Sequence, residues 1–101
     1  MIIAVTAHGV ELQAPDDFKS FKIVAAGDLS SGALQMALNG IATVDTDGKT
    51  AWVGRDAVKR LRGPSPAPDW AASFDRMVES VRRFGWVKDE TVRAHIETAP
   101  S

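Results

Sequence analysis

Short segments in which hydrophobic and polar residues alternate, or in which β-branched residues gather, recur along the first half of the chain. Successive side chains of a strand point to opposite faces of a sheet, so a period of two predicts strands. We therefore expect strands at 2–6, around Val10 and Leu12, at 22–26, at 41–46 and at 49–53.

Asp47 and Gly48 separate the last two of these strands. Asp-Gly as a two-residue connection predicts a hairpin with a type I′ turn, in which both positions take positive φ. In this register Thr43 lies opposite Trp52, and alternation divides the hairpin into two faces. One face carries Ala42, Val44, Ala51 and Val53, and the other carries Thr43, Thr50 and Trp52.

After Asp69 the hydrophobic residues recur with the period of a helix and no longer alternate. Aspartate is a preferred N-cap residue, so Asp69 is expected to cap the helix that follows. The apolar residues that follow are spaced at i, i+4, i+7, i+11 and i+14 and form one stripe: Trp70, Phe74, Met77, Val81 and Phe84. Gly85 is a typical stop, so the pattern predicts a long helix over 70–84. Burying these five side chains is worth roughly 10 kcal/mol before entropy, so the helix must pack on a sheet.

Shorter helices are expected at 33–38 and 55–61, each followed by a glycine that favours termination. A proline-rich segment at 64–68 is expected to connect the second of these to the long helix.

The tail from Lys88 to Glu97 fits two patterns. Val92 and Ile96 stand at i, i+4 after Asp89, as in a capped helix. Val92, Ala94 and Ile96 also alternate with polar residues, as in an edge strand. We favour the helix.

These elements predict an α+β fold, with an antiparallel sheet of four to five strands and the long C-terminal helix, with shorter helices, packed on one face. The chain has 101 residues, of which 45% are hydrophobic and 25% charged. These values are typical of one globular domain, so we expect residues 1–101 to share a single core.

The amino-acid composition excludes several classes of function. The chain has no cysteine, which excludes disulfides, thiolate catalysis and Cys-based metal sites. Twelve basic and thirteen acidic side chains give a net charge of −1, which argues against a nucleic-acid partner. The apolar start is too short for a membrane span or a signal sequence, and we place the protein in the cytoplasm by default.

Candidate motifs are incomplete. Gly48-Lys49-Thr50 lacks the upstream glycine of a P-loop, and Asp45–Gly48 lacks the later glutamate of a calcium loop. His8 and His95 are interpreted as structural or solvated residues, because partners for chemistry are not adjacent in the sequence. We expect no cofactor and no metal.

Trp52 is the most informative candidate residue. It shares its face of the hairpin with Thr43 and Thr50. If helices cover the other face, Trp52 must be covered by a second subunit, a ligand or the N-terminal segment. Burial inside the monomer is an equal alternative. We favour a small soluble non-catalytic module for protein binding that forms a homodimer through the sheet face or edge near Trp52.

A second hypothesis is a small enzyme or a small-molecule-binding protein with a pocket between sheet and helices. His8, Asp28 and Arg55 are the residues expected to line such a pocket.

Overall fold

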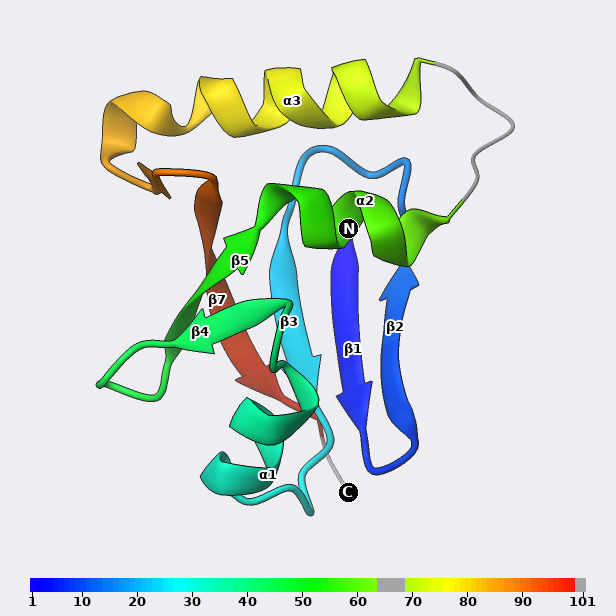
Figure 1. Cartoon of the computed structure of the whole chain (residues 1–101), viewed down its shortest axis with the longest axis vertical. Coiled ribbons are helices and arrows are strands. Elements are labelled where there is room, and N and C mark those ends of the chain that lie inside the picture. Colours follow the sequence, from blue (N-terminus) through cyan, green and yellow to red (C-terminus); the bar gives the residue numbers. More distant parts are fainter. Residues whose placement is uncertain (64–68, 100–101) are drawn as a thin grey trace.

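The strand-like segments of the sequence form one mixed sheet with helices on one side of it (Figure 1). The computed structural model describes residues 1–63 and 69–99, apart from the side chain of Ser31, so the expected connector at 64–68 lies outside the described residues. The strands are β1 (Ile2–Thr6), β2 (Gly9–Gln13), β3 (Lys22–Ala25), β4 (Ala42–Val44), β5 (Thr50–Gly54), β6 (Val87–Lys88) and β7 (Thr91–Thr98). The helices are α1 (Ser31–Ala37), α2 (Arg55–Arg62) and α3 (Trp70–Ser80), and a 3₁₀ turn follows at Arg82–Phe84.

The sheet has seven strands and is mixed, which corrects the predicted antiparallel sheet of four to five strands. Its order is β2-β1-β3-β7-β5-β4, and β6 pairs with the start of β7. β1 and β3 are parallel, as are β3 and β7, whereas the other pairs are antiparallel. The loop after β2 returns the chain to the start of β1, which makes β3 parallel to β1, and the tail then joins the sheet beside β3.

The tail is strand β7, so the favoured helix over this segment is wrong. β7 is not an edge strand either, because β3 and β6 pair along one side and β5 along the other. Val92 and Ala94 are buried on one face of the sheet, which is the alternation that the sequence also showed. Residues spaced at i, i+4 share a face in a helix and also in a strand. The segment forms a strand because it pairs with β3 on one side and with β5 on the other.

The long helix predicted over 70–84 is also corrected. α3 ends at Ser80, and the Phe84 N–H then donates to the Val81 C=O (3.1 Å) in the 3₁₀ turn. Three residues per turn break a stripe that needs 3.6, so Phe84 points outward and is 54% exposed. Gly85 takes a φ of 77° and ends the turn, as the sequence predicted for this position.

One cluster of buried residues joins the helices to one face of the sheet. Trp70 belongs to this cluster: its ring stacks on Phe74 (centroids 5.4 Å apart), and Phe18 and the Arg62 guanidinium lie against it. The Trp70 indole N–H donates to the Pro15 C=O (2.7 Å), so the ring also fixes the loop ahead of β3.

The β4–β5 hairpin is confirmed in its register, with the pairs Ala42–Val53, Thr43–Trp52 and Val44–Ala51. Its turn is not type I′, because Gly48 takes a positive φ (70°) and Asp47 does not. The Asp47 carboxylate instead accepts the N–H groups of Lys49 (2.9 Å) and Thr50 (3.3 Å). The turn is thus held by hydrogen bonds to the Asp47 side chain, and Asp47 does not need the left-handed conformation that a type I′ turn requires.

The sheet face turned away from the helices is left open by the described residues. Every buried strand residue lies on the helix-covered face except Thr50, which is 8% exposed. We call the opposite side the open face; its outward residues include Ile2, Ala4, Glu11, Lys22, Val24, Thr43, Thr50, Trp52, Arg93, His95 and Glu97.

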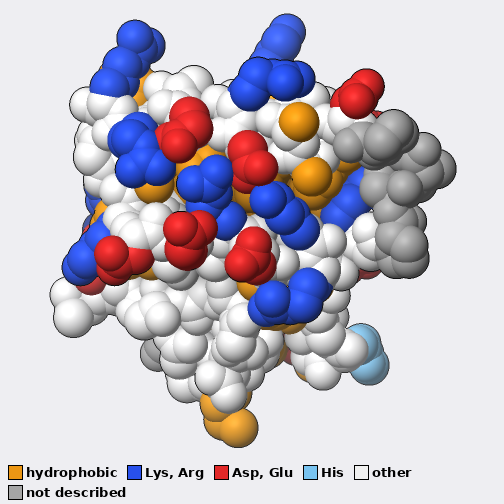
Figure 2. Space-filling model, turned by 45° about the horizontal axis from the view of Figure 1, so that its top comes forward, with side chains coloured by type: hydrophobic (Ala, Val, Ile, Leu, Met, Phe, Trp, Pro, Cys, Tyr) orange, Lys and Arg blue, Asp and Glu red, His pale blue; other side chains and the backbone are white. Residues whose placement is uncertain are grey.

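Asp75 of α3 ties α2 to α3. Its two carboxylate oxygens accept hydrogen bonds from Arg55 (2.9 Å) and Lys59 (3.1 Å). Burial acts to raise the pKa of Asp75, but the two cations outweigh it and hold the pKa below its ordinary value. Seen from the side of α3, basic and acidic side chains are interspersed over both helices (Figure 2).

Replacing Asp75 by Asn is expected to destabilise the fold by about 1 kcal/mol, because solvent screens a side chain that is 37% exposed. Because the pKa of Asp75 is lower in the folded chain than in the unfolded chain, its ionised carboxylate stabilises the fold at pH values above the unfolded pKa of about 3.9. This contribution is lost as the pH falls through the folded pKa. The difference between wild type and Asp75→Asn in denaturant unfolding should therefore shrink below about pH 4. Asp16→Asn, at an exposed loop carboxylate, is the control. A difference that does not decrease as the pH is lowered below about 4 would contradict this assignment.

Gln35 of α1 protects the edge strand β4. Its amide accepts the Val44 N–H (2.8 Å) and donates to the Ala42 C=O (3.3 Å), while the Ala42 N–H donates to the Leu38 C=O (2.9 Å). Edge groups satisfied in this way cannot pair with a strand of another chain.

Gln35→Leu is expected to expose these edge groups, with a loss of about 1–2 kcal/mol and faster hydrogen exchange at the Val44 amide. Gln35→Glu keeps the acceptor for Val44 and should cause a smaller change. Met36→Leu, at the exposed neighbouring residue, is the matched control. Unchanged exchange at Val44 in Gln35→Leu would show that the side chain does not hold this edge.

Candidate functional site

Trp52 lies on the open face, as the hairpin register required. Thr43 of β4 pairs with it on one side and Arg93 of β7 on the other, and its side chain is only partly buried. No described helix covers this face, so the monomer does not enclose Trp52 in its core. Trp52 and Thr43 therefore remain available to a partner.

Thr50 has a structural role instead. Its hydroxyl donates to the Asp47 carboxylate (3.3 Å), which also accepts the Lys49 and Thr50 N–H groups. The backbone hydrogen bond from Lys49 is the main cause that lowers the pKa of Asp47, and Thr50 adds to it. Thr50 thus holds the hairpin turn that positions Trp52.

Charges on the open face are separated along the strands. Register places Ile2, Lys22, His95 and Thr50 in one row across the sheet, and Ala4, Val24 and Glu97 in the next, where β2 adds Glu11. The first row has the basic side chains Lys22 and His95 at its centre and is called the basic row. The second has Glu11 and Glu97 at the two ends of the apolar pair Ala4 and Val24 and is called the acidic row. Lys22 and Glu97 join the two rows through an ion pair of 3.0 Å.

His8, Asp28 and Arg55 do not form one site. His8 follows β1 and Asp28 follows β3, so both lie beyond the carboxyl ends of these parallel strands. Arg55 follows β5, which runs antiparallel to β7 and hence to β3, so it lies at the opposite end of the sheet. Arg55 is also occupied by Asp75 (2.9 Å). The three residues therefore do not line one pocket together, although a hollow of about 300 Å³ at β1 and β2 includes His8.

Trp86 is the functional candidate that the sequence pattern did not single out. It is 42% exposed, and its ring lies 5.2 Å from that of Phe84. The Trp86 C=O accepts the Arg93 N–H (2.8 Å), which fixes Trp86 at the start of β6 beside β7. The pairing of β6 with β7 places Trp86 beside β7. The spacing of residues around Trp86 in the sequence does not predict this pairing.

Within residues 1–63 and 69–99, no three His, Asp or Glu side chains gather as metal ligands would. No helix in that part of the chain combines the length and the apolar composition that crossing a bilayer requires. The chain matches no protein-family model, no curated protein and no solved structure.

Proposed function

We propose that this protein is a non-catalytic interaction module that forms a homodimer through its open face, and we keep the cytoplasm as its proposed compartment. The observation that carries the proposal is the open face, on which Ile2, Ala4 and Val24 are neighbours and Trp52 lies on the far side of β7, all partly exposed and covered by no described element. Apolar side chains interspersed with charges are characteristic of such interfaces.

The charge pattern supports a second copy of the chain as the partner. A two-fold axis that lies in the interface and runs across the strands would place the acidic row of each copy on the basic row of the other. Ala4 would then face the partner subunit's Ile2, and Glu97 would face the partner subunit's His95. In the same arrangement Lys22, which is paired with Glu97 of its own chain, would face the partner subunit's Val24.

The face is a better candidate than the sheet edge beside Trp52. The backbone groups of β4 that point outward are bonded to Gln35 and Leu38, so this edge has few free partners to offer. Association near Trp52 is therefore proposed to be face to face.

Sedimentation equilibrium of the full chain tests the proposal. Wild type is expected to show a concentration-dependent dimer, and Val24→Lys should weaken it at least about tenfold, because the interface would then bury an additional unpaired charge. Trp52→Ser should weaken it as well, by removal of a large apolar contact.

Ala72→Lys is the matched control, since Ala72 is an exposed residue of α3 on the helix-covered side. Circular dichroism of each variant confirms that the fold is retained. A wild type that stays monomeric at about 0.5 mM, or a dimer that Val24→Lys leaves unchanged, would refute self-association through this face.

A further inference from the structure

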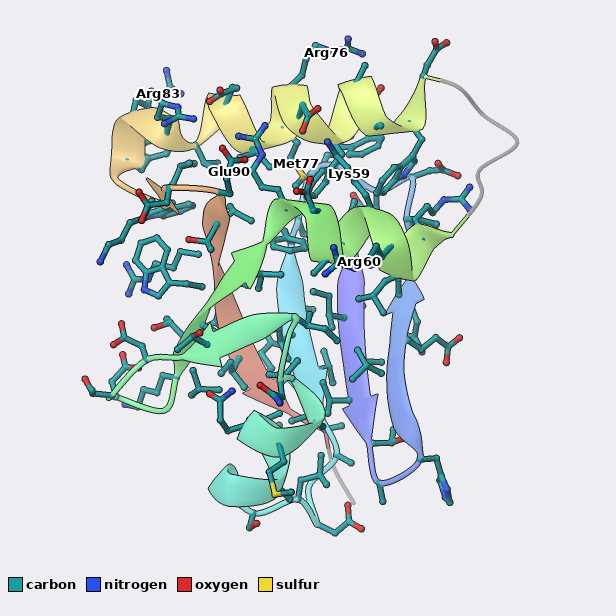
Figure 3. The ribbon with its side chains drawn as sticks, in the orientation of Figure 1. Lys59, Arg60, Arg76, Met77, Arg83 and Glu90 are labelled. Atoms are coloured by element: carbon teal, nitrogen blue, oxygen red, sulfur yellow. The ribbon has the colours of Figure 1, made fainter. Side chains whose placement is uncertain are left out.

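A groove lies between α3, the loop ahead of β3, and β6. Phe18, Phe21, Met77, Val81 and Trp86 form its apolar walls, and its volume is about 200 Å³. Met77 projects from the side of α3 that faces the rest of the molecule, whereas Arg76 projects outward (Figure 3). We call this the aromatic groove.

The aromatic groove continues onto the open face. A second hollow of about 380 Å³ shares Phe21, Trp86 and Arg93 with it and adds Thr50 and His95. The shared residues make the two hollows neighbours along β7, with Arg93 at their junction. A ligand at Arg93 can therefore extend between aromatic side chains in either direction.

The charge of the lining is one-sided. Lys19 and Arg93 line the two hollows together with His95, and no carboxylate of the described residues lines either one. Among the described residues, neither Lys19 nor Arg93 forms an ion pair. A guanidinium at the junction of apolar walls is complementary to an apolar chain that ends in a carboxylate, which it can bind through two parallel hydrogen bonds.

We propose that the aromatic groove binds a small amphipathic carboxylate, with its chain between Phe21 and Trp86 and its carboxylate on Arg93. This places a ligand pocket between sheet and helix, at residues other than His8, Asp28 and Arg55. The proposal does not depend on dimer formation. Arg93 and His95 also belong to the open face, so a bound carboxylate would compete with a second copy for them.

The test uses hexanoate, with hexanamide as the neutral molecule of the same chain length. Binding is followed by the NMR signal of the Trp86 indole N–H, identified from its loss in Trp86→Phe. Titration extends to about 10 mM, since so small a ligand in an open groove is expected to bind near about 1 mM. The full chain is measured both as wild type and as Val24→Lys, so that self-association neither hides nor imitates binding.

Hexanoate is expected to bind about fivefold more tightly than hexanamide, because only the carboxylate forms charge-assisted hydrogen bonds. Arg93→Gln should abolish this preference and leave hexanamide binding unchanged. Met77→Ala, which shortens another wall of the groove and keeps the Trp86 signal, should weaken both ligands. Arg76→Gln, the same change at an exposed arginine outside the groove, should alter neither.

Three results would overturn the proposal: no shift of the Trp86 signal up to about 10 mM, equal binding of the two ligands, or a preference that survives Arg93→Gln. Circular dichroism checks the fold of Arg93→Gln. If that variant is unfolded, Lys19→Gln replaces it, with a reduced preference for hexanoate as the expected result and an unchanged preference as the refuting one.

Discussion

Pairing along both sides of β7 is the constraint on which the rest of the structure depends. β7 pairs with β3 and β6 on one side and with β5 on the other, so among the described strands it alone links the β2-β1-β3 half of the sheet to the β5-β4 half. Val92 and Ala94 bring the core of both halves together under the helices. The same strand carries Arg93 and His95 on the other face, so the core and both proposed surfaces share one scaffold.

A one-sided arrangement of helices follows from how few residues this chain can devote to them. α2 and α3 are short and are joined to each other through Asp75, and together with α1 they cover a single face. β6 pairs with only the start of β7, which leaves Phe21 and Trp86 beside each other where β3 begins. The open face and the aromatic groove are thus two results of incomplete coverage of one sheet.

Local patterns predicted the parts of the fold that local interactions determine. The hairpin register, α2 and the strands before residue 55 follow from alternation and turn residues, and the structure contains them. The tail could not be assigned, because Val92 and Ile96 suit both periods and only contacts with Lys22 and Trp52, far away in sequence, favour a strand. Trp52 and Thr43 could be placed on one face for the same local reason, whereas Trp86 meets Phe21 only through β7.

The position of β7 in the chain has a consequence for biosynthesis. The ribosome releases amino-terminal segments first, so β3 and β5 emerge before β7, the neighbour with which both of them pair. Until it inserts, both present unpaired backbone groups that can recruit strands from other nascent chains. Closure of the sheet must also bridge the distance in sequence between Lys22 and His95, which slows folding.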